Sequence, residues 1–456
     1  MGGRLMHICG KNAGRWLGER LAWGDESEGV NQFLMRKRKE FSPWTPFRKG
    51  KLLLCSFAKN APGVSPAKRL SLEGSSRGTF LSQKERFPSN VPHVDISALM
   101  RYNTSGNLTK EFMHMRRKIV LIGAGMMGTA LTLPASANGN VVHVVGTPLD
   151  REIIEHAKKT HRQRTMDRKL PDTNVYYQIE ELDKALEGAD FVISGVSSFG
   201  VDWLLAEALP HVPEDVPVLS VTKGLVDDRD GNLETIPAYL KRKCGRPLNI
   251  CAIGGPCTAY ELADLRQSCV TFCGEDMATL EMMKAAMETD YYHVALSTDV
   301  TGVECAVAMK NAYALAVTSA VGALEAQEGV GCHEAYNPQA GIFGQSVREM
   351  SRMLALLGGR PENIMLAAGD LYVTVYGGRT RMLGKLLGRG MTIEEALKEL
   401  SGVTLESVSI ATRTVRALRV RASRGEIDPK DFPILMHIGD VLDGKCKLSM
   451  PWKSFQ

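Results

Sequence analysis

Apolar positions recur in two patterns that divide the chain into two parts. Between residues 116 and 296, short apolar runs alternate with helical stretches, and these runs lie at 119–122, 141–145, 189–198, 216–225 and 249–255. This alternation predicts a Rossmann-type α/β domain, a parallel, doubly wound sheet with ligands at the carboxyl ends of its strands. Strand-like runs disappear after about residue 297. The pattern at 297–445 therefore predicts a second, all-helical domain, followed by a tail at 446–456.

The predicted helical domain begins with an apolar segment that contains one unexpected charge. Residues 304–326 read ECAVAMKNAYALAVTSAVGALEA, and Lys310 is the only charged residue between Glu304 and Glu325. Ala, Leu, Met and Val without an interior Pro favour a helix, and a face this apolar is normally buried. A buried ammonium group must find partners or lose its proton. Lys310 is therefore either a functional group or a structural one that lies at the solvent edge, snorkels from a buried stem, or forms an ion pair.

A glycine-rich turn, GAGMMG at 123–128, follows the first apolar run and begins a helical stretch. In a dinucleotide-binding fold, Gly123 permits the tight turn, Gly125 lets the backbone approach the pyrophosphate, and Gly128 lets the helix pack on the strand. Met126 and Met127 lie between these glycines. Because the motif follows a strand and opens a helix, it predicts a dinucleotide site.

Three further segments carry polar or glycine-rich chemistry. SVTKG places Lys223 where a predicted strand stops, and GGPCTAYELA at 254–263 places glycines, a Pro and a Cys before a helix. In the second domain, residues 367–390 are polar and Gly-rich and contain Asp370, Thr374, Arg379 and Arg381. This stretch is either a solvated loop or a phosphate-binding segment, because guanidinium groups and backbone amides hold phosphate well.

Residues 1–115 differ in composition from the rest of the chain. They contain 19 Lys and Arg against 9 Asp and Glu, whereas residues 116–456 contain 37 against 42. Clusters of Ser, Pro and Gly and the basic run RKRKEF show little sustained periodicity, which predicts a disordered extension or a targeting segment. A basic run of this kind is usually a solvated tail, so we predict no nucleic-acid partner.

The rest of the composition limits which cellular compartment and which cofactors we expect. No apolar stretch is expected to reach the ~20 residues that span a membrane. The ten Cys are scattered without CxxC pairs, and the His lack metal-ligand spacing, which favours reduced thiols in a cytosol-like compartment and predicts no metal site. The alternative is an organelle, if residues 1–115 are a transit peptide.

Six motifs occur in one order: GAGMMG (123–128), TKGL (222–225), GGPCTAYELA (254–263), AMKNAYALA (308–316), GDLYVT (369–374) and GGRTRMLG (377–384). Together they resemble the NAD(P)-dependent glycerol-3-phosphate dehydrogenase family, especially its bacterial and archaeal soluble branch, over nearly all of residues 117–445. The resemblance implies a 6-phosphogluconate dehydrogenase-like fold and reversible reduction of dihydroxyacetone phosphate to sn-glycerol 3-phosphate. It also implies a cytoplasmic homodimer whose product feeds glycerophospholipid synthesis.

The resemblance also implies a role for each matched residue. Lys310 in AMKN is similar to the family's catalytic lysine, the acid for reduction, and Asp370 in GDL would lie beside it and tune its pKa. Lys223 in TKG resembles a second lysine that contacts the substrate near the nicotinamide. Arg379 in GGR resembles the phosphate-holding arginine, which also lies at the cofactor. Further substrate contacts are implied for Gly255, Asn311, Thr374 and Thr380. Two positions depart from the family pattern, which commonly has Asn at Thr380 and Ser or Asn at Cys257.

The choice between NADP and NAD stays open in the sequence. In this fold an acidic residue at the end of the second strand binds the ribose 2′-hydroxyl and marks NAD. Gly146 and Thr147 occupy that position here, with Asp150 and Arg151 shortly after. The missing acid permits NADP, whose 2′-phosphate Arg151 could meet, so NADP is slightly favoured. Glu406 in VTLESV matches a family position near the cofactor.

Two alternatives to this function remain. Dehydrogenases that act on a 3-hydroxy acid or on ketopantoate share the two-domain plan, so the fold alone does not decide between them. The motif GGRTR favours a phosphorylated substrate. A non-catalytic dinucleotide-binding protein is the second alternative, against which Lys223, Lys310 and Asp370 argue.

Overall fold

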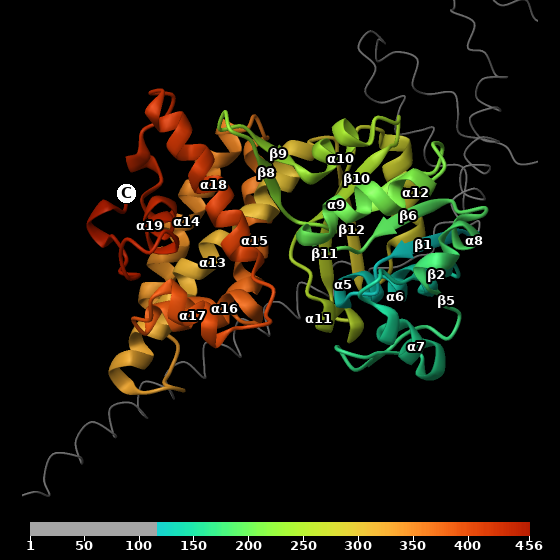
Figure 1. Ribbon diagram of the computed structural model, residues 1–456, viewed down its shortest axis with the longest axis horizontal. Coiled ribbons are helices and arrows are strands. Elements are labelled where there is room, and N and C mark those ends of the chain that lie inside the picture. Colours follow the sequence, from blue (N-terminus) through green and yellow to red (C-terminus); the bar gives the residue numbers. More distant parts are fainter. Residues whose placement is uncertain (1–115) are drawn as a thin grey trace, which may run out of the picture. The chain divides into compact units, whose positions relative to one another are not determined.

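The computed structural model describes residues 116–456, so the extension predicted for residues 1–115 lies outside the described residues. Its first half is an eight-stranded sheet (Figure 1). The strands follow the spatial order β12 (Tyr292–Ser297), β11 (Ser268–Cys273), β10 (Ile250–Gly254), β7 (Val218–Ser220), β6 (Phe191–Ser194), β1 (Lys118–Ile122), β2 (Val141–Val145) and β5 (Val175–Tyr177). All neighbouring pairs are parallel except β10 and β11. The predicted doubly wound sheet is confirmed, with one antiparallel pair that the apolar runs did not indicate.

The central strand β1 explains why both faces of the sheet are covered. Ile119 and Leu121 point to one face and Val120 and Ile122 to the other, because side chains alternate along a strand, and all four are fully buried. One face packs against α5 (Met126–Ala130), α6 (Thr132–Ala137), α7 (Arg151–Thr160), α11 (Ala259–Ala263) and α12 (Met277–Met287). The other packs against α8 (Leu182–Leu186), α9 (Val201–Trp203) and α10 (Ile236–Cys244). Short strands β3 (Arg162–Gln163) and β4 (Arg168–Lys169) form a separate pair.

The strand order reverses at β1, which pairs with β2 on one side and with β6 on the other. In an open parallel sheet, the loops at such a switch point diverge and leave a crevice at the carboxyl ends of the strands. The glycine-rich turn at 123–128 directly follows β1. The fold therefore places this turn at the crevice.

The second half is helical and is built around α13 (Val300–Glu328). Around it lie α14 (Tyr336–Leu356), α15 (Ile364–Val375), α16 (Gly378–Gly388), α17 (Ile393–Glu399), α18 (Glu406–Ser423) and α19 (Pro433–Leu442). By length and composition α13 could cross a membrane, so the expectation that no stretch is long and apolar enough was wrong. However, 78% of its apolar window is buried inside the protein, as in the core helix of a globular domain.

Glycines set how closely α16 crosses α13. A Cβ atom on Gly384 would lie 1.9 Å from Thr318 Oγ1, and one on Gly388 would lie 2.1 Å from the Ser319 carbonyl oxygen. Two residues that resemble loop glycines in the sequence are therefore helical residues at a close contact. The segment 367–390, for which a solvated loop was one interpretation, is mostly the two helices α15 and α16, which break at Tyr376 and Gly377.

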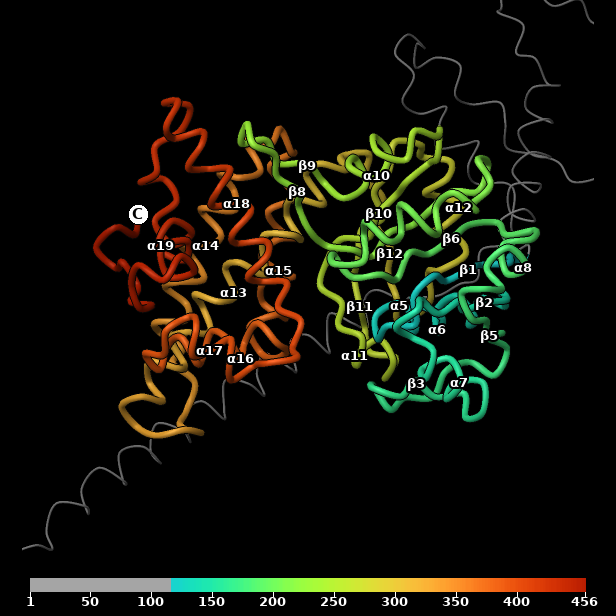
Figure 2. The backbone as a smooth tube through the Cα atoms, in the orientation of Figure 1, coloured from blue at the N-terminus to red at the C-terminus, as the bar shows by residue number. Residues whose placement is uncertain are grey.

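A β-hairpin links the sheet domain to the helical domain (Figure 2). Its strands are β8 (Leu225–Asp227), which begins two residues after Lys223, and β9 (Leu233–Thr235). Arg416 of α18 binds the Asp227 carboxylate through Nε and Nη2, at 2.5 and 2.8 Å, and Arg413 Nη1 donates to the Leu225 carbonyl oxygen at 3.1 Å. These contacts fix the chain just beyond Lys223 against the domain that carries Lys310.

Candidate active site

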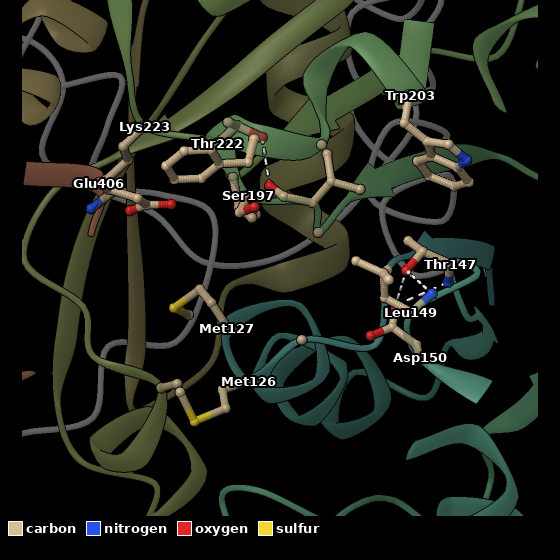
Figure 3. A pocket seen from close by; sticks show the side chains of 18 of the residues that line it. Met126, Met127, Thr147, Leu149, Asp150, Ser197, Trp203, Thr222, Lys223 and Glu406 are labelled. Atoms are coloured by element: carbon tan, nitrogen blue, oxygen red, sulfur yellow. Dashed lines mark hydrogen bonds between the residues drawn. The ribbon is translucent and has the colours of Figure 1, made fainter. Parts of the chain in front are cut away.

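A cavity of about 720 Å³ opens at the carboxyl ends of β1, β2, β6 and β7 and extends to the helical domain (Figure 3). In Figure 3, Lys223 and Glu406 lie at one end of the cavity, and Thr147, Leu149 and Trp203 lie at the other. Ten of the predicted site residues line this cavity: Gly123, Gly125, Met126, Met127, Thr147, Lys223, Lys310, Asn311, Arg379 and Glu406. Most of the predicted site is therefore a single continuous surface.

The glycine-rich turn has the shape that a dinucleotide requires. Gly123 has φ +100°, and a Cβ atom there would lie 3.1 Å from the backbone carbon of Gly195. Gly128 does not line the cavity, and a Cβ atom there would lie 3.0 Å from Leu121 Cδ1, so it permits contact between helix and strand. Gly125 remains at the surface of the cavity, where no side chain covers its backbone. These residues fit a bound pyrophosphate.

Asp150 holds the turn after β2 beside the glycine-rich turn. Its Oδ2 atom accepts hydrogen bonds from Thr147 N at 2.9 Å, from Thr147 Oγ1 at 2.7 Å and from Ala124 N at 3.1 Å. The carboxylate is thus already occupied by three donors. Arg151, the next residue, is exposed and ion-pairs with Glu180, and it does not line the cavity.

Two lysines from different domains share one buried carboxylate. Lys310 Nζ of α13 lies 2.5 Å from Asp370 Oδ1, and Lys223 Nζ, beyond β7, lies 2.5 Å from Asp370 Oδ2. Lys223 Nζ also donates to the Gly255 carbonyl oxygen at 3.0 Å. Asp370 of α15 is fully buried behind the two lysines and does not line the cavity. The ion pair that was one structural interpretation of Lys310 is present, and it lies at the cavity.

Burial and charge separate the proton affinities of the two lysines. Burial lowers the pKa of Lys310 below its ordinary value; the Asp370 carboxylate partly offsets this effect, and the Lys223 ammonium adds to it. Burial also lowers the pKa of Lys223, but the Asp370 carboxylate outweighs it, so the pKa of Lys223 is raised overall. Lys310 is therefore the lysine that releases a proton more readily.

The helical domain also contributes an exposed cation to the cavity. Arg379 is the second residue of α16, and among residues 116–456 it has no hydrogen-bond or ion-pair partner. The amino end of an eleven-residue helix adds backbone N–H groups and a positive partial charge beside it. A guanidinium group and a helix amino terminus together form a suitable site for an anion such as phosphate.

Three other predicted substrate contacts lie outside the cavity wall. Thr374 Oγ1 donates to the Asp370 carbonyl oxygen at 2.7 Å, and Thr380 is buried. Gly255, at φ +119°, presents its carbonyl oxygen to Lys223, and a Cβ atom there would lie 3.1 Å from the Cys269 carbonyl oxygen. In the structure these residues support Lys223 and Asp370 or lie beneath the surface.

Sequence reasoning missed the loop that follows β6. Gly195, Ser197 and Phe199 from this loop, and Trp203 from the helix α9 that follows it, line the cavity. The available signal was the apolar run at 189–198, because its strand ends at the same carboxyl edge as the glycine-rich turn. Cys257 also lines the cavity, and burial raises its thiol pKa to about 11, so the thiol is neutral. Across residues 116–456, no group of three or more His, Cys, Asp or Glu could hold a metal ion.

The Rossmann sheet, its glycine-rich turn and the lysine-bearing helical domain define a two-domain, dinucleotide-dependent dehydrogenase. Comparison with known proteins gives the family. Residues 118–280 match the model of the NAD-dependent glycerol-3-phosphate dehydrogenase N-terminus, and residues 299–452 match that of the C-terminus. The chain belongs to the NAD-dependent glycerol-3-phosphate dehydrogenase family. It is accordingly an NAD(P)-dependent oxidoreductase, as the motifs predicted.

Individual relatives agree with this family. The NADP(+)-dependent glycerol-3-phosphate dehydrogenase of Archaeoglobus fulgidus is 35% identical over 285 residues, which cover 62% of this chain and 83% of the relative. The glycerol-3-phosphate dehydrogenase [NAD(P)+] of Xylella fastidiosa strain M23 is 30% identical over 315 residues, 67% of this chain and 85% of the relative. The crystal structure of glycerol-3-phosphate dehydrogenase from Coxiella burnetii has the same fold, with a TM-score of 0.61, 22% identity, and coverage of 75% of this chain and 98% of that one.

Proposed function

We propose that the protein reversibly reduces dihydroxyacetone phosphate to sn-glycerol 3-phosphate, with NADPH or NADH as the hydride donor. The observation that carries this proposal is one shared cavity, which is lined by the lysine pair, by the glycine-rich turn and by Arg379, a residue without a partner in the described part of the chain. The names of the archaeal and bacterial relatives support the same activity. Reduction of a phosphorylated ketone requires a proton donor, here the buried Lys310 ammonium, and a site for the phosphate anion, here the exposed Arg379.

In the proposed mechanism, Lys310 supplies the proton. A dinucleotide held at the glycine-rich turn would supply hydride to C2 of the ketone, and negative charge would then grow on the ketone oxygen. An N–H bond of the Lys310 ammonium breaks as an O–H bond forms on that oxygen, and the amine keeps the electron pair. Its lowered pKa favours this transfer, and the same amine accepts the proton in the reverse oxidation. Lys223 keeps its charge and stabilises the developing oxyanion.

The substrate phosphate is proposed to bind Arg379 and the amino end of α16. Guanidinium groups bind phosphate through paired N–H donors, and Arg379 has all its donors free of other described residues. Asn311, one residue after Lys310 on the same cavity wall, adds an amide that can bind a substrate oxygen. Thr374 and Thr380 are proposed to act without touching the substrate: Thr374 supports Asp370, and the buried Thr380 supports α16.

The cofactor is proposed to lie along the glycine-rich turn, from Thr147 at one end of the cavity to Lys223 at the other. Met126, Met127 and Glu406 provide the remaining wall of this path. NADP is favoured slightly over NAD, because Thr147 and not an acid follows β2 and because Arg151 lies four residues later. The proposal extends to a homodimer in the cytoplasm whose product enters glycerophospholipid synthesis.

A direct assay tests the proposed activity. The purified full-length chain is mixed with NADPH or NADH and dihydroxyacetone phosphate, and loss of cofactor absorbance is followed. Turnover is expected with the phosphorylated ketone, and much slower turnover with dihydroxyacetone, which lacks the phosphate that Arg379 would bind. Ketopantoate serves as the test of the related two-domain dehydrogenases. No turnover of dihydroxyacetone phosphate with either cofactor would reject the proposal.

A further inference from the structure

Glu304 is a buried acid that the proposed mechanism does not use. It lies in α13 and is fully buried, and neither Oε1 nor Oε2 has a hydrogen-bond partner among residues 116–456. Leaving a buried polar group unsatisfied costs about 1–3 kcal/mol, and more if the group is charged. An acid in this position therefore has no evident structural benefit from hydrogen bonding.

A second buried acid in the same domain shows how a structural carboxyl group is satisfied. Glu349 of α14 accepts from Ile434 N at 2.9 Å and from Leu435 N at 3.1 Å, and it also contacts Gln345 and Tyr313. These contacts satisfy the amino end of α19. Glu304 has no such set of donors, so its place in α13 calls for another explanation.

The charged group that acts electrostatically on Glu304 is Lys223. Burial raises the pKa of Glu304 to about 8, and the Lys223 ammonium acts in the opposite direction. The other titratable groups that interact with Glu304 are the thiols Cys273 of β11 and Cys305 of α13, whose pKa values are raised by burial, so both are neutral. Asp370 of α15, which like Glu304 belongs to the helical domain, forms an ion pair with the same Lys223 ammonium.

Position along α13 also directs Glu304 toward the site. Glu304 and Asn311 are seven residues apart, so they lie on the same side of the helix, two turns from each other. Asn311 lines the cavity, and Lys310 precedes it. Glu304 is therefore on the side of α13 that carries Asn311, and because it is fully buried it lies beneath the cavity surface there.

The charges around the lysine pair determine what this acid could do. Two ammonium groups share the buried carboxylate of Asp370, and the other acid that acts on Lys310 is Glu406, which raises its pKa. The Lys223 ammonium is one of the causes that lower the pKa of Lys310. A carboxylate at Glu304 would offset the Lys223 charge and so help Lys310 to keep its proton.

We propose that Glu304 is a positioning residue that balances the charge of the lysine pair, changing from a carboxylic acid to a carboxylate as the pH rises and thereby keeping Lys310 protonated. The inference rests on the proposed function, because it concerns the acid of the proposed reduction. The step is a simple exchange of protons with solvent: the O–H bond of Glu304 breaks, the carboxylate keeps the electron pair, and the charge appears next to Lys223.

The first test compares pH profiles of kcat/KM for dihydroxyacetone phosphate. Reduction needs the Lys310 ammonium, so the rate falls as the pH rises through the pKa of Lys310. Glu304→Gln keeps the shape of the side chain but cannot ionise, so the pKa of Lys310 should be lower in this variant. Its alkaline fall should begin about 0.5–1 pH unit below that of the wild type.

Glu349→Gln is the matched control for the pH profile. Burial raises the pKa of Glu349 to about 7, but its carboxylate contacts α19 and not the lysine pair. This control should keep the wild-type alkaline fall. Equal profiles for Glu304→Gln and the wild type, or an equal shift in both variants, would overturn the inference.

Infrared difference spectra of the wild-type chain supply a readout that does not need turnover or a folded Glu304 variant. The carboxylic-acid stretch of a buried acid should be visible at lower pH and should disappear as the pH is raised through about 8. The same band should be present in Glu349→Gln, which removes the second candidate acid. An absent acid band in Glu349→Gln would overturn the inference. If the wild type shows the band but reduces no dihydroxyacetone phosphate, the proposed function fails while the titration of Glu304 stands.

Discussion

The candidate site holds positive charge in two opposite ways. Lys223 and Lys310 are largely buried and share the carboxylate of Asp370. Arg379 is exposed and has no partner among residues 116–456. All three side chains line the same cavity.

This difference matches two different chemical tasks. Burial and close opposite charge shift a pKa, so a buried, paired lysine can be tuned to exchange a proton. An exposed guanidinium keeps its charge at all ordinary pH values and binds an anion without changing its own protonation. Changes at the lysine pair should therefore act mainly on kcat and its pH dependence, and changes at Arg379 mainly on KM.

The largest effect is expected for Lys310→Ala. Removing the proton donor should lower kcat about 10³-fold, since general acid catalysis contributes roughly 10²–10⁴-fold. Binding of NADPH, followed by fluorescence titration, should stay within a few-fold of the wild type. Lys398→Ala removes an exposed lysine of α17 and serves as the control. Loss of NADPH binding together with activity would instead make Lys310 a structural residue.

Asp370→Asn should affect both stability and rate. The substitution leaves two ammonium groups close together without their shared carboxylate, and breaking such a buried pair costs about 3–5 kcal/mol. The free energy of unfolding in urea should fall by an amount of that order, and kcat should fall about 10²-fold because Lys310 loses its main stabilising charge. Asp431→Asn, at an exposed ion pair with Arg352, is the matched control and should change neither quantity appreciably. A stable Asp370→Asn variant with normal kcat would contradict the shared role of this carboxylate.

Arg379→Ala should change substrate affinity more than the chemical step. Loss of a charge-assisted contact with phosphate should raise the KM for dihydroxyacetone phosphate about 10–100-fold. The rate with dihydroxyacetone, which has no phosphate, should remain close to that of the wild type. Arg381→Ala is a control two residues along α16, because Arg381 is already paired with Glu334. An unchanged KM in Arg379→Ala would reject the phosphate-binding role.

The local parts of this site were accessible from the sequence. The apolar run before Gly123 and the spacing to Gly128 predicted the dinucleotide turn, because strand, turn and helix follow each other directly along the chain. The conflict between an apolar helix and the charge of Lys310 also marked a site, because a buried ammonium group requires a partner. Lys223 lies where a predicted strand ends. In each case the signal and its cause lie within a few residues.

The non-local parts were not accessible in the same way. The contact between Lys223 and Asp370 joins residues 147 positions apart and depends on how two domains meet. Gly384 and Gly388 resembled loop residues, although their lack of a side chain lets α16 approach Thr318 and Ser319. Trp203 was missed because only the apolar run at 189–198, and nothing within the segment of Trp203 itself, indicates which strand edge that segment faces. The position of the unsatisfied Glu304 likewise required the three-dimensional structure.

Arg151 presents a third case, between the other two, because it is exposed but has a partner. The side chains of Arg151 and Glu180 are 53% and 59% exposed, and an ion pair this open contributes little to stability. Glu180 therefore does not prevent Arg151 from turning toward the 2′-phosphate of NADPH. Arg151→Ala should raise the KM for NADPH about 3–10-fold and leave the KM for NADH within about 2-fold, since only NADPH carries that phosphate. Glu180→Gln, which removes the competing carboxylate, should lower the KM for NADPH. Equal changes for the two cofactors in Arg151→Ala would mean that this arginine does not distinguish them, and that it is a surface residue without contact to the 2′-phosphate.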